Sequence, residues 1–169
     1  MKKEELTLEF IYNLVFSLAE QLDWRDYSVT LFWDVYPAAK SLIAKTKKFN
    51  DSEIATTGGM VFADPSIGKL VELYAGGIQK LVLLGMKVRS LEEIDNERLR
   101  KWISRIILHE YRHTLQYDWM LENGISYYAA GENEAKYLYG EGPMESDANL
   151  FAAGKYVKPF EELFIDLLL

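Results

Sequence analysis

Residues 96–124 read NERLRKWISRIILHEYRHTLQYDWMLENG, and this stretch decides the fold. Its apolar residues recur at helical spacing, which predicts one long amphipathic helix beginning at Asn96. They are Leu99, Trp102, Ile103, Ile106 and Ile107. Asn123-Gly124 supplies a C-terminal stop, because these two residue types tolerate the backbone that ends helices. Everything else is placed relative to this helix.

The composition limits what the chain can do. With 169 residues, 49% of them hydrophobic, it has the size and apolar content of one domain, and we treat 1–169 as a single unit. The formal net charge of −7 argues against binding nucleic acid or an anionic membrane surface. Because there is no cysteine, disulfides and thiolate metal sites are excluded. A metal site would have to use His, Asp and Glu.

The N-terminal segment superficially resembles a signal peptide, with Lys2 and Lys3 ahead of an apolar stretch. Acidic residues interrupt it, and its apolar residues fall at helical spacing, so we expect an amphipathic first helix. These apolar residues are Ile11, Leu14, Val15, Leu18 and Leu22. No apolar run reaches the length of a membrane span, so the expected location is cytoplasmic.

The remaining patterns predict short strands followed by helices, hence an α+β fold. Alternation over 27–33 indicates a half-buried strand, and Pro37 suits a helix through Ile43. Residues 58–63 and 69–75 form a probable hairpin, with Gly58-Gly59 and Gly76-Gly77 as turns, whereas 78–88 fits either helix or strand. Further helices are predicted from Gly142-Pro143 and over 159–169.

The chemistry concentrates in His109-Glu110-Tyr111-Arg112-His113, which contains both histidines of the chain. Positions i and i+4 lie about 40° apart on one helical face, so the two imidazoles can reach one ion. This is the His-Glu-x-x-His spacing of zinc peptidases. In that chemistry Glu110 takes a proton from a zinc-activated water and returns it to the departing amine.

A third ligand must be a carboxylate, because no other His or Cys exists. Asp118 is expected to face away, being nine residues and about 180° from His109. Glu145 is better placed, in the first turn of the helix predicted after Gly142-Pro143. The alternatives left open are Glu132, Glu134, Glu141 and Asp147.

The motif followed by Glu145 resembles the gluzincin-type zincin metallopeptidases. Residues 145–152, Glu-Ser-Asp-Ala-Asn-Leu-Phe-Ala, are similar to a helix of ImmA/IrrE-like peptidases, and 109–116 with 143–148 resemble small phage-type metallopeptidases. The resemblance covers mainly residues 96–153. It implies a zincin-like fold, with a small, mostly antiparallel sheet, a long active-site helix and further C-terminal helices. It also implies one bound zinc.

Several polar residues are expected around the ligands. If the resemblance holds, Asn149 accepts a hydrogen bond from a ligand histidine, and Gln116, only about 20° off the ligand face, lines the cleft or contacts a ligand. Asp147 is placed in the same surrounding layer. For the hydroxyl that stabilises a developing oxyanion, Tyr137 and Tyr139 are the candidates, although packing is an alternative role for both.

The sequence therefore predicts a zinc-dependent metalloprotease acting on a narrow protein target. The alternative is a zinc-stabilised module that binds a protein without cutting it, in which a full protein ligand set would close the metal site. Residues 69–75 are either an edge strand that could receive an extended peptide or an ordinary internal strand. The oligomeric state, the substrate, and whether 125–142 forms a lid or a packed wall stay open.

Overall fold

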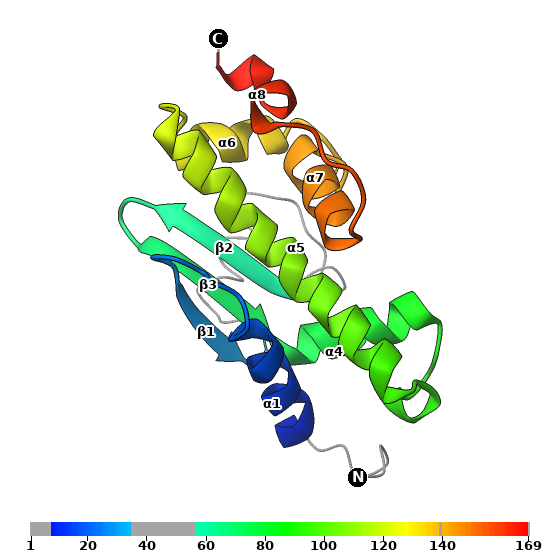
Figure 1. Cartoon of the computed structure of the whole chain (residues 1–169). Helices are drawn as coiled ribbons and strands as arrows, with labels where there is room; N and C mark the ends of the chain where they lie inside the picture. Colours follow the sequence, from blue (N-terminus) through cyan, green and yellow to red (C-terminus); the bar gives the residue numbers. More distant parts are fainter. Residues whose placement is uncertain (1–7, 35–56, 139, 169) are drawn as a thin grey trace.

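A computed structural model of the chain describes residues 8–34, 57–138 and 140–168, and its elements confirm an α+β fold (Figure 1). The helix predicted after Pro37 and the candidate Tyr139 lie outside the described residues. The strands are β1 (Ser28–Phe32), β2 (Gly59–Asp64) and β3 (Gly68–Tyr74). The α-helices are α1 (Leu8–Ala19), α4 (Ala75–Met86), α5 (Asn96–Glu122), α6 (Tyr127–Glu134), α7 (Pro143–Ala152) and α8 (Phe160–Leu163). The described residues also include two 3-10 turns, η2 (Leu91–Glu93) and η3 (Ile165–Leu167).

The sheet has three strands in the order β1-β3-β2. β2 and β3 form the predicted antiparallel hairpin, but β1 pairs with β3 in parallel. The sheet is therefore mixed, and the expectation of a mostly antiparallel sheet is not met. Of the two roles left open for 69–75, the structure shows the internal strand, because β3 lies in the centre with a partner on each side. β1 is exposed over its first three residues, so the predicted alternation is only partly seen.

Helix α5 is the long helix predicted from the sequence, and it crosses one face of the sheet (Figure 1). Asp95 caps its start by accepting a hydrogen bond from the Arg98 backbone N–H, and Asn123 follows its last turn. Its apolar face joins the sheet and the predicted first helix, α1, in one buried cluster. Because the apolar side of α5 is buried in that cluster, the polar side of the helix faces away from it.

Of the stretch left open between helix and strand, 78–88, residues 78–86 lie in α4 and Lys87 follows its end. The prediction that Gly76-Gly77 forms a turn is wrong, since both glycines lie in the first turn of α4. A Cβ on Gly76 would lie 2.8 Å from the Trp33 carbonyl oxygen, and one on Gly77 would overlap the Thr57 carbonyl. These glycines are therefore explained by close backbone approach rather than by chain reversal.

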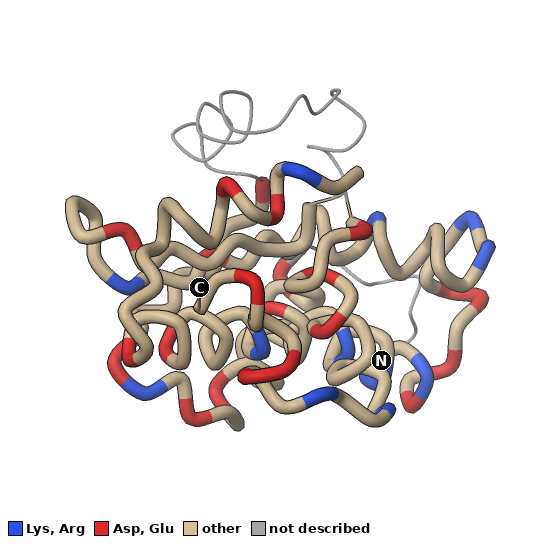
Figure 2. The backbone as a smooth tube through the Cα atoms, turned by 90° about the horizontal axis from the view of Figure 1, so that it is seen from above, with Lys and Arg blue, Asp and Glu red and all other residues tan. Residues whose placement is uncertain are grey.

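Helices α6, α7 and α8 gather around the C-terminal half of α5 and share a second buried cluster. Its members are Met120, Ile125, Ala130, Met144 and Phe164. α7 begins at Pro143 as predicted, and the closing helix is shorter than the predicted 159–169. Acidic and basic residues are interspersed along the described chain (Figure 2). Within the described ranges, no helix is both long and apolar enough to cross a membrane.

Candidate metal centre

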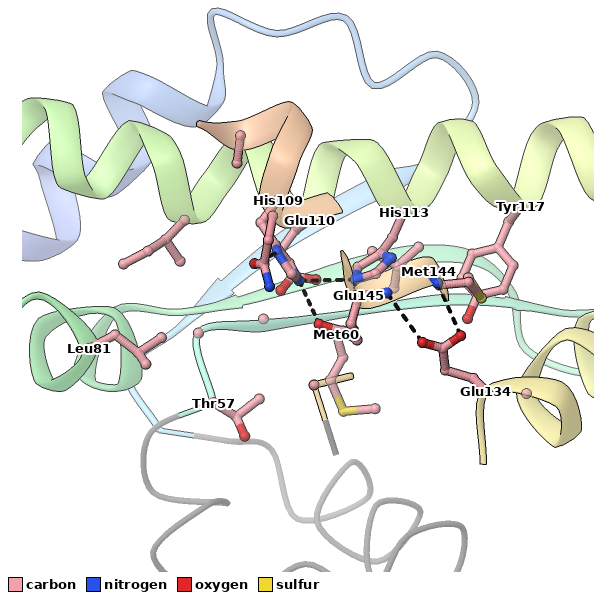
Figure 3. Close-up of a pocket in the computed structure, with 18 of the residues that line it drawn as sticks. Thr57, Met60, Leu81, His109, Glu110, His113, Tyr117, Glu134, Met144 and Glu145 are labelled. Atoms are coloured by element: carbon pink, nitrogen blue, oxygen red, sulfur yellow. Dashed lines mark hydrogen bonds and ion pairs between the residues drawn. The ribbon is translucent and has the colours of Figure 1, made fainter. Parts of the chain in front are cut away.

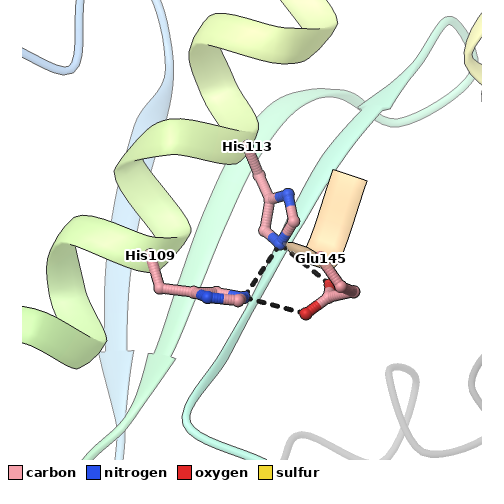
Figure 4. A group of neighbouring side chains, drawn as sticks. All are labelled: His109, His113 and Glu145. Carbon is pink, nitrogen blue, oxygen red and sulfur yellow. Dashed lines mark hydrogen bonds and ion pairs between the residues drawn. The ribbon is translucent and has the colours of Figure 1, made fainter. Parts of the chain in front are cut away.

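His109 and His113 project from one face of α5, one turn apart, and their rings meet edge to face (Figure 4). Their Nε2 atoms lie 3.1 Å from each other. This is the arrangement that the i, i+4 spacing predicts for two imidazoles sharing an ion.

Glu145 reaches the same point from the first turn of α7. Its Oε2 lies 3.0 Å from the Nε2 of His109, and its Oε1 lies 3.0 Å from the Nε2 of His113. Ligands bound to zinc at 2.0–2.1 Å in a tetrahedron are about 3.3 Å apart, so the distance between the two nitrogens and the distance from each nitrogen to its carboxylate oxygen are close to the spacing that zinc requires. Although burial opposes ionisation, the two histidines hold the pKa of Glu145 well below its usual range.

The hydrogen bonds of Gln116 fix the proton on His113. The Gln116 amide nitrogen donates to the Met144 carbonyl at 2.9 Å and to Asp147 Oδ2 at 2.8 Å, so its oxygen is the atom facing the imidazole. That oxygen lies 2.7 Å from His113 Nδ1, which must therefore carry a hydrogen. With Nδ1 committed to Gln116, Nε2 is the nitrogen that faces Glu145 and His109, and it is the atom that would bind a metal once its own proton is released.

Asn149 contacts Nδ1 of His109 as Gln116 contacts Nδ1 of His113. Its Oδ1 lies 2.8 Å from His109 Nδ1, and it stands one turn after Glu145 on α7. A single short helix thus supplies both a candidate ligand and the group that orients another ligand. The sequence-based placement of Asn149 and Gln116 beside the histidines agrees with these contacts.

A buried ion pair between Arg112 and Asp147 joins α5 to α7 behind the ligands. The Arg112 guanidinium donates to both carboxylate oxygens, at 2.7 and 3.2 Å, and also stacks over Phe151 and Phe160. Because the same carboxylate accepts from Gln116, a continuous chain of contacts runs from Arg112 to His113. Asp147 is therefore a supporting residue rather than a ligand.

Glu134, at the end of α6, caps the first turn of α7. Its two carboxylate oxygens accept hydrogen bonds from the backbone N–H groups of Met144 (3.1 Å) and Glu145 (3.2 Å). A Cβ on Gly142 would overlap this carboxylate, so glycine is what allows the cap to form. Desolvation raises the pKa of Glu134, although these N–H groups oppose the rise. Sequence reasoning treated Glu134 as an alternative ligand and missed the cap.

Glu110 is buried beside the histidines, with its side chain against the backbone of Gly59 on β2. Desolvation raises its pKa, and the nearby histidines oppose that rise. Among the described residues, no hydrogen bond or ion pair occupies its carboxylate. Its carboxyl group is therefore available to exchange a proton in the cleft.

The ligands lie in the wall of a cleft of about 970 Å³ that is lined mostly by apolar atoms. Figure 3 shows Leu81 at one end and Glu134 at the other, with the histidines between them. The candidate Tyr137 is about half exposed and is not part of the cleft lining.

Tyr117 is the tyrosine that sequence reasoning missed. It follows His113 by four residues, on the same face of α5, and it lines the cleft (Figure 3). Desolvation, together with nearby acidic groups, raises its pKa well above the ordinary value, so its hydroxyl stays protonated. The repeat 109, 113, 117 was the sequence signal for this position.

The other carboxylates considered from the sequence are not part of the candidate ligand set. Among the described residues, the one cluster of three or more potential ligands is His109, His113 and Glu145. Asp118 faces away as predicted, paired with Arg25 and Lys69. Among the described residues, no fourth potential ligand joins this cluster.

In comparisons with known proteins, no family model, curated protein or solved structure matches this chain.

Proposed function

We propose that the chain is a zinc-dependent peptide-bond hydrolase of the gluzincin type, with a zincin-like fold. The observation that carries the proposal is the convergence of His109, His113 and Glu145 within about 3 Å, beside the carboxylate of Glu110, which no described residue pairs with. Three protein ligands and an open position are the usual arrangement of catalytic zinc, whereas structural zinc is closed by four.

Each residue of the site has a separate role in the proposed reaction. Zinc, when bound, would lower the pKa of a coordinated water and polarise the substrate carbonyl. Glu110 is placed to accept the proton of the attacking water and then to donate it to the leaving amine. Tyr117, which lines the cleft one turn after His113, would supply the hydroxyl donor that a developing oxyanion needs. Gln116 and Asn149 keep the histidines oriented throughout.

The substrate would be a protein or peptide bound along β2. This strand pairs with β3 on one side, and among the described residues no strand pairs with its other edge. Gly59, Met60, Val61 and Asp64 of β2 line the cleft. An extended peptide can add to such an edge through backbone hydrogen bonds, which would carry its scissile bond past the ligands.

Two variants test the proposal. Glu145→Ala should retain little of the zinc found by mass spectrometry in protein purified without added metal, whereas the wild type should hold about one ion per chain. Glu110→Gln should keep the zinc and abolish peptide hydrolysis. Glu97→Gln, at the start of α5, is the matched control and should change neither quantity. Turnover retained by Glu110→Gln, or no zinc in the wild type even after zinc is supplied, would refute the proposed function.

The alternative, a zinc-stabilised interaction module, requires a fourth protein ligand to close the site. Asp147 and Glu141 were the candidates for that ligand. Asp147 is held by Arg112 and Gln116 instead, and among the described residues neither joins the cluster of His109, His113 and Glu145. Within the described parts of the chain, the geometry therefore favours hydrolysis over a purely structural zinc.

A further inference from the structure

The two ends of the cleft differ in charge. At the end formed by α4 and the N-terminal half of α5, Arg105 is the charged lining residue among those that the structure describes. At the end formed by α6, the lining includes Asp64, Glu132 and Glu134. Figure 3 shows these ends on opposite sides of the histidines. A peptide lying along the cleft would therefore meet a cation on one side of its scissile bond and anions on the other.

Arg105 is an exposed cation without a carboxylate partner among the described residues. Its guanidinium lies 5.5 Å from the centroid of the Trp102 ring, which holds it over an aromatic surface. On the helix, Arg105 precedes His109 by four residues, hence by about 6 Å along the axis and on the same face. A carboxylate one or two residues from the scissile bond lies within reach of this side chain, since a strand rises about 3.3 Å per residue.

The same end of the cleft is apolar beneath the guanidinium. Leu81, Leu84, Trp102 and Ile106 line it, and Leu84 is 65% exposed. The tight contact of α4 with α5 shapes this surface, because a Cβ on Gly85 would lie 2.7 Å from the Trp102 ring. The surface thus offers a site for a large apolar side chain next to a site for an acidic one.

From this asymmetry we propose that the cleft selects peptides carrying an acidic residue, next to a large apolar residue, on the α4 side of the scissile bond. The inference rests on the proposed function and adds the substrate class. An acidic residue on the other side would face Glu132, which is exposed in the cleft, so the charges also fix the direction in which the peptide lies. The net charge of −7 gives acidic peptides no general attraction, and the preference must come from Arg105.

The test uses the zinc-loaded Glu110→Gln variant, which should bind peptides without cleaving them, to select from a random peptide library. Acidic residues beside an apolar residue should be enriched about fivefold, the size expected of one exposed ion pair. Adding Arg105→Glu should abolish this enrichment or reverse it toward Lys and Arg. Lys101→Glu, with the same change of charge one turn earlier and outside the cleft lining, should leave the profile unchanged.

Each of these results either supports the inferred preference or overturns it. The inference would be overturned if the parent variant showed no acidic enrichment, or if the profile were identical after Arg105→Glu. Should Arg105→Glu fold poorly, Arg105→Gln repeats the test, because it removes the charge without reversing it. The selected peptides are then offered to the zinc-loaded wild type. Selective binding without cleavage would refute the proposed hydrolysis while the inferred preference stands.

Discussion

Replacing Gly142 with alanine should weaken both the fold and the metal site, through the carboxylate of Glu134. Gly142 has φ −69° and ψ 165°, which alanine adopts without strain. The new Cβ would nevertheless overlap the Glu134 carboxylate that caps α7. The carboxylate must then leave the backbone N–H groups of Met144 and Glu145.

The magnitude follows from the interactions lost. A side-chain cap at a helix N-terminus contributes about 1 kcal/mol, and a negative charge there about 0.3–1 kcal/mol more. Gly142→Ala should therefore lower the free energy of unfolding by about 2 kcal/mol, and so should Glu134→Ala. The double variant should resemble Glu134→Ala alone, because the carboxylate is already gone. The residual effect of Ala at position 142 should stay within about 0.5 kcal/mol, since its weaker capping and its stiffer unfolded chain oppose each other.

Urea unfolding of the wild type, both single variants and the double variant, in the presence of a chelator, measures this coupling directly. Because α7 begins at the capped turn, the dissociation constant for zinc should also rise about 10- to 100-fold in each variant, measured by competition with a chromophoric chelator. If Gly142→Ala costs the same with and without Glu134, the two residues are not coupled and the proposed cap is wrong.

Three further perturbations test the layer around the ligands. Asp147→Ala should cost about 3–5 kcal/mol in urea unfolding, because it leaves Arg112 buried without its partner; a cost below about 1 kcal/mol would contradict this. Gln116→Leu should weaken zinc binding about 10- to 100-fold, and unchanged affinity would remove its orienting role. Burial lowers the pKa of His113, but the Glu145 carboxylate outweighs burial and raises that pKa to about 10. In metal-free protein, the contribution of this ion pair to stability should be full below pH 6.5 and should decline as pH rises toward 10. Zinc should bind more tightly as pH rises over the same range, because His113 releases its proton. Urea unfolding and zinc titration at several pH values measure both effects, and a flat response would contradict the reasoning.

Much of the architecture was predictable because it depends on local patterns. The start and end of α5 follow from its apolar period and from Asn123-Gly124, and α7 begins where Gly142-Pro143 predicts. The parallel pairing of β1 with β3 was not predictable, since it joins residues about forty positions apart. The start of α4 was missed for a related reason: the need for Gly76 and Gly77 comes from contacts with distant backbone.

In the candidate site, too, the residues that depend on local patterns were predictable and the others were not. His109, Glu110 and His113 follow from helical geometry, and Asn149 was placed through the resemblance. Glu134 escaped prediction because a carboxylate that caps another helix has the same sequence signature as a carboxylate that binds a metal. Only the position of α6 against α7 separates the two roles.

Every group that orients the candidate ligands lies on α5 or α7, or caps α7, so metal binding and folding should be coupled. Zinc that binds only the folded state stabilises it by RT ln(1 + [Zn]/Kd), about 2.7 kcal/mol at one hundred times Kd. The urea midpoint of the wild type should therefore rise with the logarithm of zinc concentration. For Gln116→Leu the same curve should begin at 10- to 100-fold higher zinc, with the same limiting slope, because the ligands are retained while their orientation is lost. Curves that coincide would mean that Gln116 has no part in orienting His113 for the metal.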